Sequence, residues 1–185
     1  MGLTFKATGD EMEAWTDSSF RDLQDSDSTG GYVIKLFGGT VAWKSQKQSY
    51  LSLSTCQAKY LAASAAGKEI TALDKPIRDI LGKSMYPVTI WCDNKAAGNC
   101  TQMEGCHKLK DFDYEREEIE KRLIEREKTG KKPPMADSHG DYVKYCVLKG
   151  RVRVNWVSTG ENTADIMTKP LPAPSHIKLR EKLLN

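Results

Sequence analysis

The segment from Ser54 to Lys75 separates two strand-rich regions of the chain, and this arrangement restricts the fold to a sheet with packed helices. It begins with a serine and a threonine, which favour helix starts, and continues as an alanine-rich run, STCQAKYLAASAAGKEITALDK. We therefore expect a helix here. Pro76 follows directly, and we expect it to bend or end that helix.

Three short segments before this helix have the composition of β-strands. Residues 11–17, 31–37 and 40–46 are rich in β-branched and aromatic side chains, and they are separated by clusters of Gly, Asp and Ser. Because such short connections join neighbouring strands in hairpins, the pattern predicts three consecutive antiparallel strands.

The rest of the chain continues as an alternation of strands and helices. Residues 87–93 are an almost continuous apolar run, as expected for a strand buried on both faces, and a short helix should follow over 94–102. A helix over about 138–149, a strand over 151–157 and a last helix opening at 161–169 complete the order. This order predicts an α/β fold with a mixed five-stranded sheet, three antiparallel strands followed by parallel strands, flanked by helices.

The length and composition are those of one globular domain. A chain of 185 residues that is 39% hydrophobic and 29% charged can bury one ordinary core and is too short for two. We therefore interpret residues 1–185 as a single domain. Since no apolar run has the length of a membrane span, and acidic residues interrupt the beginning of the chain, we expect no membrane association and an intracellular protein, in the cytoplasm or the nucleus.

The five cysteines fit this location. They are scattered and form no CxxC pair, so we expect reduced thiols. Zinc-binding atom types are present in Cys100, Cys106, His107, His139 and Cys146. Their spacing matches no tight ligand motif, so we favour no zinc site and expect no cofactor.

Residues 108–137 interrupt the alternation with a high density of charges of both signs. Acidic and basic residues recur there at helical i,i+4 spacing, and the segment ends in Gly, Lys and two prolines. We interpret it as an inserted, solvent-exposed helix plus linker. It is either a charged surface arm or a helix that binds a protein partner through three residues near one face, Phe112, Ile119 and Leu123.

Three isolated aspartates fall at the ends of expected elements. Asp17 ends the first strand, Asp93 ends the fourth, and Asp165 lies in the first turn of the final helix. In an open sheet such ends converge on one crevice. Two-metal phosphodiester hydrolysis needs carboxylates gathered in this way, because two hard dications require oxygen ligands and negative charge. An isolated aspartate is otherwise a cap or turn residue.

One basic residue lies on the helix face that should contact the sheet. Helical periodicity from position 59 gives a small, apolar stripe made of Lys59, Ala62, Ala63, Ala66, Ile70 and Leu73. The ammonium of Lys59 should therefore point into the crevice and act as a built-in cation that neutralises Asp17 and Asp93. Gln57, two residues earlier, should lie on the more polar face of the helix.

Four motifs occur in order along the chain. They are TDSS at 16–19, STCQAKYLAAS at 54–64, IWCDN at 90–94 and ENTADIMTKPL at 161–171. Together they resemble the ribonuclease H domain of copia-type LTR retrotransposon polyproteins, over essentially the full length apart from 108–137.

This resemblance implies a ribonuclease H-like fold in which Asp17, Asp93 and Asp165 are the catalytic metal ligands. The helix motif of the family reads like STCEAEY, so Gln57 and Lys59 stand where its two glutamates would be. An ammonium about 4 Å from a dication costs on the order of 8 kcal/mol at an effective dielectric near 20. We therefore expect a catalytically impaired remnant site. The alternative is an active ribonuclease H that uses Mg²⁺ or Mn²⁺ on the three aspartates to cleave RNA in RNA–DNA hybrids.

The implied role of an impaired domain is binding, either of nucleic acid such as an RNA–DNA hybrid or of a protein partner. The net charge of +3 is compatible with a polyanion. Candidate nucleic-acid contacts in an inherited groove are Lys44, Lys47, Asn94, Lys95 and Lys169. A scattered, solvated set of basic residues is the equal alternative.

The four tryptophans all fall in expected strands, at Trp15, Trp43, Trp91 and Trp156. Large aromatic side chains in strands usually pack in the core or on a sheet face. We expect that role for them in preference to base stacking.

Overall fold

The structure is a computed structural model that describes residues 3, 5, 11–20, 28–48, 52–102, 106, 109 and 142–184. The expected insertion over 108–137 lies outside these residues apart from Leu109, which is buried. Its candidate partner-binding residues, Phe112, Ile119 and Leu123, also lie outside them.

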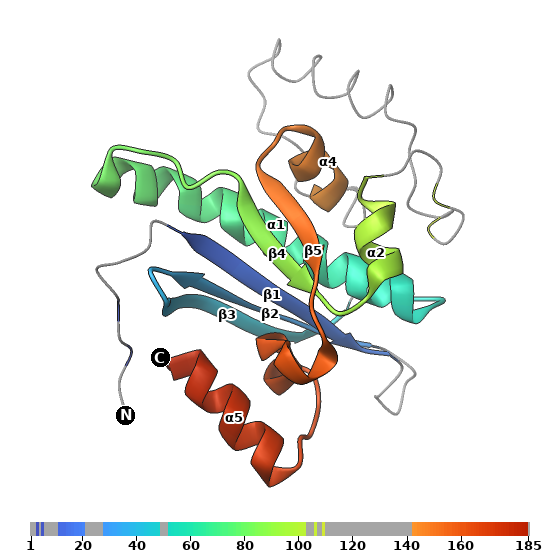
Figure 1. Cartoon of the computed structure of the whole chain (residues 1–185). Helices are drawn as coiled ribbons and strands as arrows, with labels where there is room; N and C mark the ends of the chain where they lie inside the picture. Colours follow the sequence, from blue (N-terminus) through green and yellow to red (C-terminus); the bar gives the residue numbers. More distant parts are fainter. Residues whose placement is uncertain are drawn as a thin grey trace.

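A five-stranded mixed sheet forms the centre of the molecule (Figure 1). Its strands are β1 (Met12–Ser19), β2 (Thr29–Leu36), β3 (Gly39–Lys47), β4 (Val88–Cys92) and β5 (Val152–Trp156). β2 is antiparallel to both β1 and β3, whereas β4 is parallel to β1 and β5 is parallel to β4. The spatial order is β3-β2-β1-β4-β5, which confirms the predicted mixed sheet.

Helices lie on both sides of this sheet (Figure 1). The long α1 (Thr55–Leu81), the short α2 (Lys95–Cys100) and α4 (Tyr142–Leu148) are on one side. On the other side lies α5 (Ala173–Leu184), preceded by two 3-10 turns, η2 (Thr159–Glu161) and η3 (Thr163–Met167).

The last helix begins later than predicted. The segment 161–169 does not open an α-helix but forms η3, and α5 starts only at Ala173. Pro170 and Pro172 lie between them and have no N–H to donate, so a continuous helix is not possible here. Asp165 is therefore held by a tight turn with its own geometry.

α1 has well-defined ends. The Ser54 side chain accepts a hydrogen bond from the Gln57 N–H at 3.2 Å, and Gly82 closes the helix in the left-handed region at φ 70°. Of the two outcomes expected at Pro76, a bend or an end, the end is wrong, because the helix continues to Leu81. A proline removes one backbone hydrogen bond, and the burial of Ile77 just beyond it keeps the last turns against the core.

The main core lies between α1 and the sheet. Buried side chains from alternate strand positions, such as Ala14, Ile34 and Ile90, share one hydrophobic cluster with Ala66 and Ile70 of α1. β4 differs from the prediction of a strand buried on both faces, because its burial alternates along the strand. The side opposite α1 is only partly covered, so it leaves the β4 residues there half-buried.

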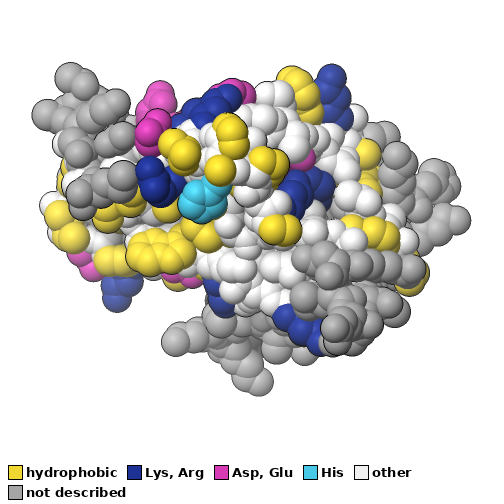
Figure 2. Space-filling model, turned by 90° about the horizontal axis from the view of Figure 1, so that it is seen from below, with side chains coloured by type: hydrophobic (Ala, Val, Ile, Leu, Met, Phe, Trp, Pro, Cys, Tyr) yellow, Lys and Arg dark blue, Asp and Glu magenta, His cyan; other side chains and the backbone are white. Residues whose placement is uncertain are grey.

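The α5 side of the molecule carries exposed hydrophobic side chains among lysine and arginine side chains (Figure 2).

Two of the four tryptophans are exposed. Trp43 of β3 is 61% exposed, and Trp156 at the end of β5 is 51% exposed. Of the two roles expected, packing in the core is therefore wrong for these two, which lie on the edge strands of the sheet. Trp15 and Trp91, on the central strands, are half-buried as expected for a sheet face.

Two of the five cysteines are paired. Cys100 at the end of α2 forms a disulfide with Cys106, so the prediction of five reduced thiols is wrong for this pair. The other three cysteines are free and buried, and the Cys146 sulfur lies 3.9 Å from the Thr71 hydroxyl oxygen. Two of the residues considered as zinc ligands, His107 and His139, lie outside the described residues.

No helix among the described residues is long and apolar enough to span a membrane.

Candidate functional site

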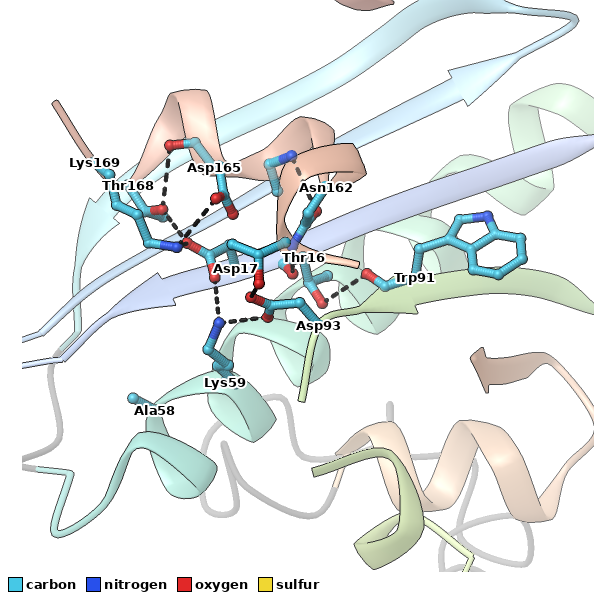
Figure 3. Close-up of polar contacts among 12 residues, drawn as sticks. Thr16, Asp17, Ala58, Lys59, Trp91, Asp93, Asn162, Asp165, Thr168 and Lys169 are labelled. Carbon is cyan, nitrogen blue, oxygen red and sulfur yellow. Dashed lines mark hydrogen bonds and ion pairs between the residues drawn. The ribbon is translucent and has the colours of Figure 1, made fainter. Parts of the chain in front are cut away.

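Three carboxylates meet at one end of the sheet (Figure 3). Asp17 is in β1, Asp93 directly follows β4, and Asp165 is in η3. One oxygen of each lies within 4.8 Å of the others, and we call these three residues the carboxylate cluster. β1 and β4 are adjacent and parallel, so their carboxyl ends reach the same edge of the sheet. This is the convergence that the sequence predicts.

Lys59 reaches into this cluster from α1 (Figure 3). Its Nζ donates to Asp17 Oδ1 at 2.6 Å and also to Asp93 Oδ1. Only 6% of the residue is exposed. The orientation predicted from the apolar stripe of the helix is confirmed.

Gln57 has a different position from the one predicted. It is buried, and its Oε1 accepts a hydrogen bond from the Leu53 N–H at 2.6 Å. Together with the cap at Ser54, this holds the first turn of α1 in a variant of the capping box, in which the glutamine accepts from the residue before the N-cap instead of the N-cap itself. The Ser-x-x-Gln spacing signals such a box, and it accounts for the burial of a residue expected on the polar face. Of the two positions aligned with motif glutamates, position 59 is the one that contacts the carboxylate cluster.

Lys169 supplies a second ammonium to the carboxylate cluster. Its Nζ lies 3.0 Å from Asp17 Oδ2 and 3.2 Å from Asp165 Oδ2. The hydroxyl of the preceding Thr168 also donates to Asp17 Oδ2. Lys169 is a predicted nucleic-acid contact and here binds carboxylates instead, and Thr168 is not among the predicted site residues. The i,i+4 spacing of Asp165 and Lys169 is the signal that points to their ion pair.

Two further polar residues hold the surrounding loops. Asn162 is fully buried, donates to the Thr16 carbonyl at 3.0 Å, and accepts from the Ala164 N–H at 3.2 Å. Thr159 donates to Asp93 Oδ2 at 3.1 Å. Neither was predicted, because the bonds from Asn162 to Thr16 and from Thr159 to Asp93 join distant parts of the chain.

The electrostatics favour ionised partners around Lys59. Burial alone would raise the pKa of Asp17, but the charge of Lys59 and the hydrogen bonds from Lys59 and Thr168 hold the pKa below its ordinary value. For Lys59, burial acts to lower the pKa, and the attraction of Asp17 and Asp93 outweighs it, so the pKa is raised. The lysine therefore stays protonated, as expected beside two carboxylates.

Asp165 is in the opposite situation. Burial and the nearby negative charge of Asp17 raise its pKa to about 6, although Lys169 opposes the change. Its Oδ1 is buried and has no hydrogen-bond partner among the described residues. Asp165 is thus the least well compensated carboxyl group of the cluster.

The other candidate nucleic-acid residues are not gathered at one place. Lys44 and Lys47 are exposed on β3, at one edge of the sheet. At the other edge, Asn94 caps α2 by accepting from the Ala97 N–H at 3.0 Å. Lys95 is exposed there, with its Nζ 4.7 Å from the ring centroid of Trp156.

The chain has distant relatives among known proteins. No protein-family profile matches the chain. It is 26% identical over 171 residues, 92% of its length, to the retrovirus-related Pol polyprotein from transposon TNT 1-94 of Nicotiana tabacum. It is 25% identical over 161 residues, 86% of its length, to the corresponding polyprotein from transposon RE2 of Arabidopsis thaliana. The chain is a distant homologue of copia-type Pol polyproteins. It spans 11% and 10% of the lengths of these two relatives.

The fold of this Pol homologue is ribonuclease H-like. It resembles the N-terminal RNase H domain of a Mycobacterium tuberculosis protein, solved as a fusion with maltose-binding protein, with a TM-score of 0.51. The match covers 94% of this chain and 98% of that chain, at 12% sequence identity. The fold predicted from the four motifs is confirmed.

The carboxylate cluster of this Pol homologue has the oxygen ligands that a hard divalent cation requires. However, two ammonium groups contact the same carboxylates. When all five groups are ionised, three carboxylates and two ammonium groups leave one net negative charge. A pair of divalent ions needs far more compensation, so the residues in this arrangement do not fit a metal pair.

Proposed function

We propose that this chain is a ribonuclease H-like domain of retrotransposon origin that binds nucleic acid, such as an RNA–DNA hybrid, with impaired or absent hydrolysis. The observation that carries the proposal is the position of the Lys59 ammonium between Asp17 and Asp93. The group is buried, charged and hydrogen-bonded to both carboxylates.

The chemical argument is one of competition for the same oxygens. Lys59 uses Oδ1 of Asp17 and Oδ1 of Asp93, while Lys169 and Thr168 use Oδ2 of Asp17. A divalent ion on Asp17 must displace one of these donors and then lie close to an ammonium. The repulsion between a dication and an ammonium at such a distance is several kcal/mol even at a moderate dielectric.

Two features support a nucleic-acid ligand. The homology is to Pol polyproteins, and exposed lysines lie on either side of the carboxylate cluster, Lys44 and Lys47 on the edge strand β3 and Lys95 at the start of α2. Ser45 pairs with Gly31 and Gly31 pairs with Asp17, so Lys44 lies two strands away from the cluster. A polyanionic backbone that crosses this end of the sheet would meet lysines on either side of the carboxylates.

A cleavage assay tests the loss of hydrolysis. An RNA–DNA hybrid is incubated in Mg²⁺ and in Mn²⁺ with the wild type, with Lys59→Glu and with Gln57→Glu. We expect little or no cleavage by the wild type and by Gln57→Glu, which differs from Lys59→Glu in the position of the added acid but not in its chemistry. Cleavage gained by Lys59→Glu alone would identify the ammonium as the cause of the loss.

Equal and substantial cleavage by the wild type and Lys59→Glu would overturn the proposal in favour of an active metal-dependent ribonuclease H acting through Asp17, Asp93 and Asp165. Binding is measured separately, by titrating the hybrid at several salt concentrations. We expect an affinity that falls steeply with salt, because lysines on both edges of the sheet neutralise phosphates. Absence of any measurable binding at low salt would contradict the nucleic-acid part of the proposal.

A further inference from the structure

We propose that Trp156 and Lys95 form a binding site for an unpaired nucleotide next to the carboxylate cluster. In this site the base stacks on the exposed indole and a phosphate pairs with the ammonium. The inference rests on the proposed function, because it names the part of a nucleic-acid ligand that this edge of the sheet would hold.

The pair combines an exposed aromatic ring with an exposed cation. Trp156 is the last residue of β5 and is 51% exposed. The Nζ of Lys95, at the start of α2, lies 4.7 Å from the centroid of its ring. A lysine over an indole is a favourable cation–π contact, and it keeps the ring and the charge together at the surface.

The pair is also tied to the carboxylate cluster by short connections. Lys95 is two residues after Asp93, and Thr159, three residues after Trp156, donates to Asp93 Oδ2 at 3.1 Å. Between them, the Val157 N–H donates to the Cys92 carbonyl at 3.1 Å and extends the pairing of β5 with β4. A ligand on Trp156 is therefore held directly beside Asp93.

A nucleotide is the ligand that matches both groups. Its base offers a flat aromatic face to the indole, and its phosphate offers an anion to the ammonium. The bases of a double helix are already stacked on one another, so a base that covers Trp156 has to be unpaired. The ligand is accordingly a hybrid with a single-stranded overhang, and its duplex part lies toward the carboxylate cluster.

The chain contains a matched control for this site. Trp43 is 61% exposed and also lies on an edge strand, but this strand is β3, at the opposite edge of the sheet from β5. If any exposed tryptophan stacked on nucleic acid without a defined site, Trp43 and Trp156 would behave alike.

The test compares two fluorescently labelled probes of the same duplex sequence, a blunt RNA–DNA hybrid and the same hybrid with a short single-stranded overhang, by fluorescence anisotropy. In the wild type we expect the overhang to raise the affinity about tenfold, since base–aromatic stacking has that magnitude. Trp156→Ala should lose this gain, while Trp156→Phe and Trp43→Ala should keep most of it. Binding of the blunt hybrid should be the same in all four proteins.

A salt titration tests the second member of the pair. Lys95→Gln should reduce the slope of log affinity against log salt by about 0.7 for the overhang probe, as expected for the loss of one contact to a single-stranded phosphate. Trp156→Ala should weaken binding without changing this slope.

The outcomes separate this inference from the proposed function. If the blunt hybrid binds but the overhang adds nothing, or if Trp43→Ala and Trp156→Ala lose the gain equally, the nucleotide site is wrong and the proposed function stands. If the wild type binds neither probe, both are wrong. Folding of each variant is checked by its thermal unfolding curve, and if Trp156→Ala unfolds, the salt titration of Lys95→Gln still tests the site: an unchanged slope would overturn it.

Discussion

Lys59 and Asp17, separated by 42 positions in the sequence, are joined by a buried hydrogen bond of 2.6 Å between an ammonium and a carboxylate. Asp17 is fully buried, so its charge depends on partners supplied by the protein. Lys59 from α1 and Lys169 from the segment after η3 provide them. Two ammonium groups of the chain itself thereby offset most of the negative charge at this end of the sheet.

Lys59→Gln should lower the free energy of unfolding by about 3 kcal/mol, because it leaves two buried carboxylates with one counter-charge fewer. Millimolar Mg²⁺ should restore part of this loss, since a cation can then occupy the space beside Asp17 and Asp93. Urea unfolding with and without Mg²⁺ measures both effects. Lys75→Gln, which removes an exposed lysine from the same helix, is the control, and a similar small effect of both substitutions would contradict the structural role of Lys59.

Asp165→Asn should stabilise the protein at pH 7. The pKa of Asp165 is raised from 3.8 to about 6 in the folded state, so its contribution to stability is greatest below pH 3.8 and is lost as the pH rises to about 6. The neutral amide removes this dependence and should add roughly 1 to 3 kcal/mol at pH 7. The measurement is the free energy of unfolding between pH 4 and 8.

Asp17→Asn is the opposite control for that experiment. The pKa of Asp17 is lowered, so the ionised form contributes stability above 3.8 that is lost as the pH falls through the folded pKa. This substitution should destabilise the protein at pH 7. If both asparagine variants changed the stability in the same direction, the difference in environment between the two carboxylates would be refuted.

Gly31→Ala should destabilise the protein by about 1 to 3 kcal/mol, because the added methyl group meets the packed turn after η3. A Cβ at Gly31 would lie 2.7 Å from Met167 Cβ and 2.9 Å from Thr168 Cγ2. Thermal unfolding measures the effect. Gly160→Ala is the matched control, since a Cβ there meets nothing within 4 Å, and its melting temperature should stay close to that of the wild type.

Gln57→Ala should cost about 1 kcal/mol, the usual contribution of one hydrogen bond at a helix start. It removes the acceptor of the Leu53 N–H and leaves the carboxylate cluster untouched. Its response to Mg²⁺ should therefore match that of the wild type, in contrast to Lys59→Gln. A Mg²⁺-dependent rise in stability of Gln57→Ala would place this residue at the cluster after all.

The sequence predicted those parts of the site that depend on local periodicity. The face of Lys59 follows from the spacing of small residues along one helix, and the positions of Asp17 and Asp93 follow from strand ends. The contact of Lys169 with Asp17 was not predicted, because it joins segments that lie far apart in the sequence. Gln57 was misplaced because its side chain caps the helix and does not follow the polar face.

Edge positions were equally hard to predict. Alternation shows which residues of a strand share a face, but the lateral order of the strands depends on contacts between distant segments. Trp156 is exposed because β5 is an edge strand in the order β3-β2-β1-β4-β5. The same residue type on the central strands is half-buried at Trp15 and Trp91.

α5 contacts two parts of the molecule, the β2–β3 hairpin and the segment just before Asp165. Near its C-terminal end, the carbonyls of Lys182 and Leu183 accept hydrogen bonds from Lys35 and Thr40 of the β2–β3 hairpin. The same helix is bound through Lys178 and Lys182 to Glu161, just before the turn that carries Asp165. α5 thus links the hairpin to the carboxylate cluster, so a sequence change at the hairpin can alter the environment of Asp165 without contacting it.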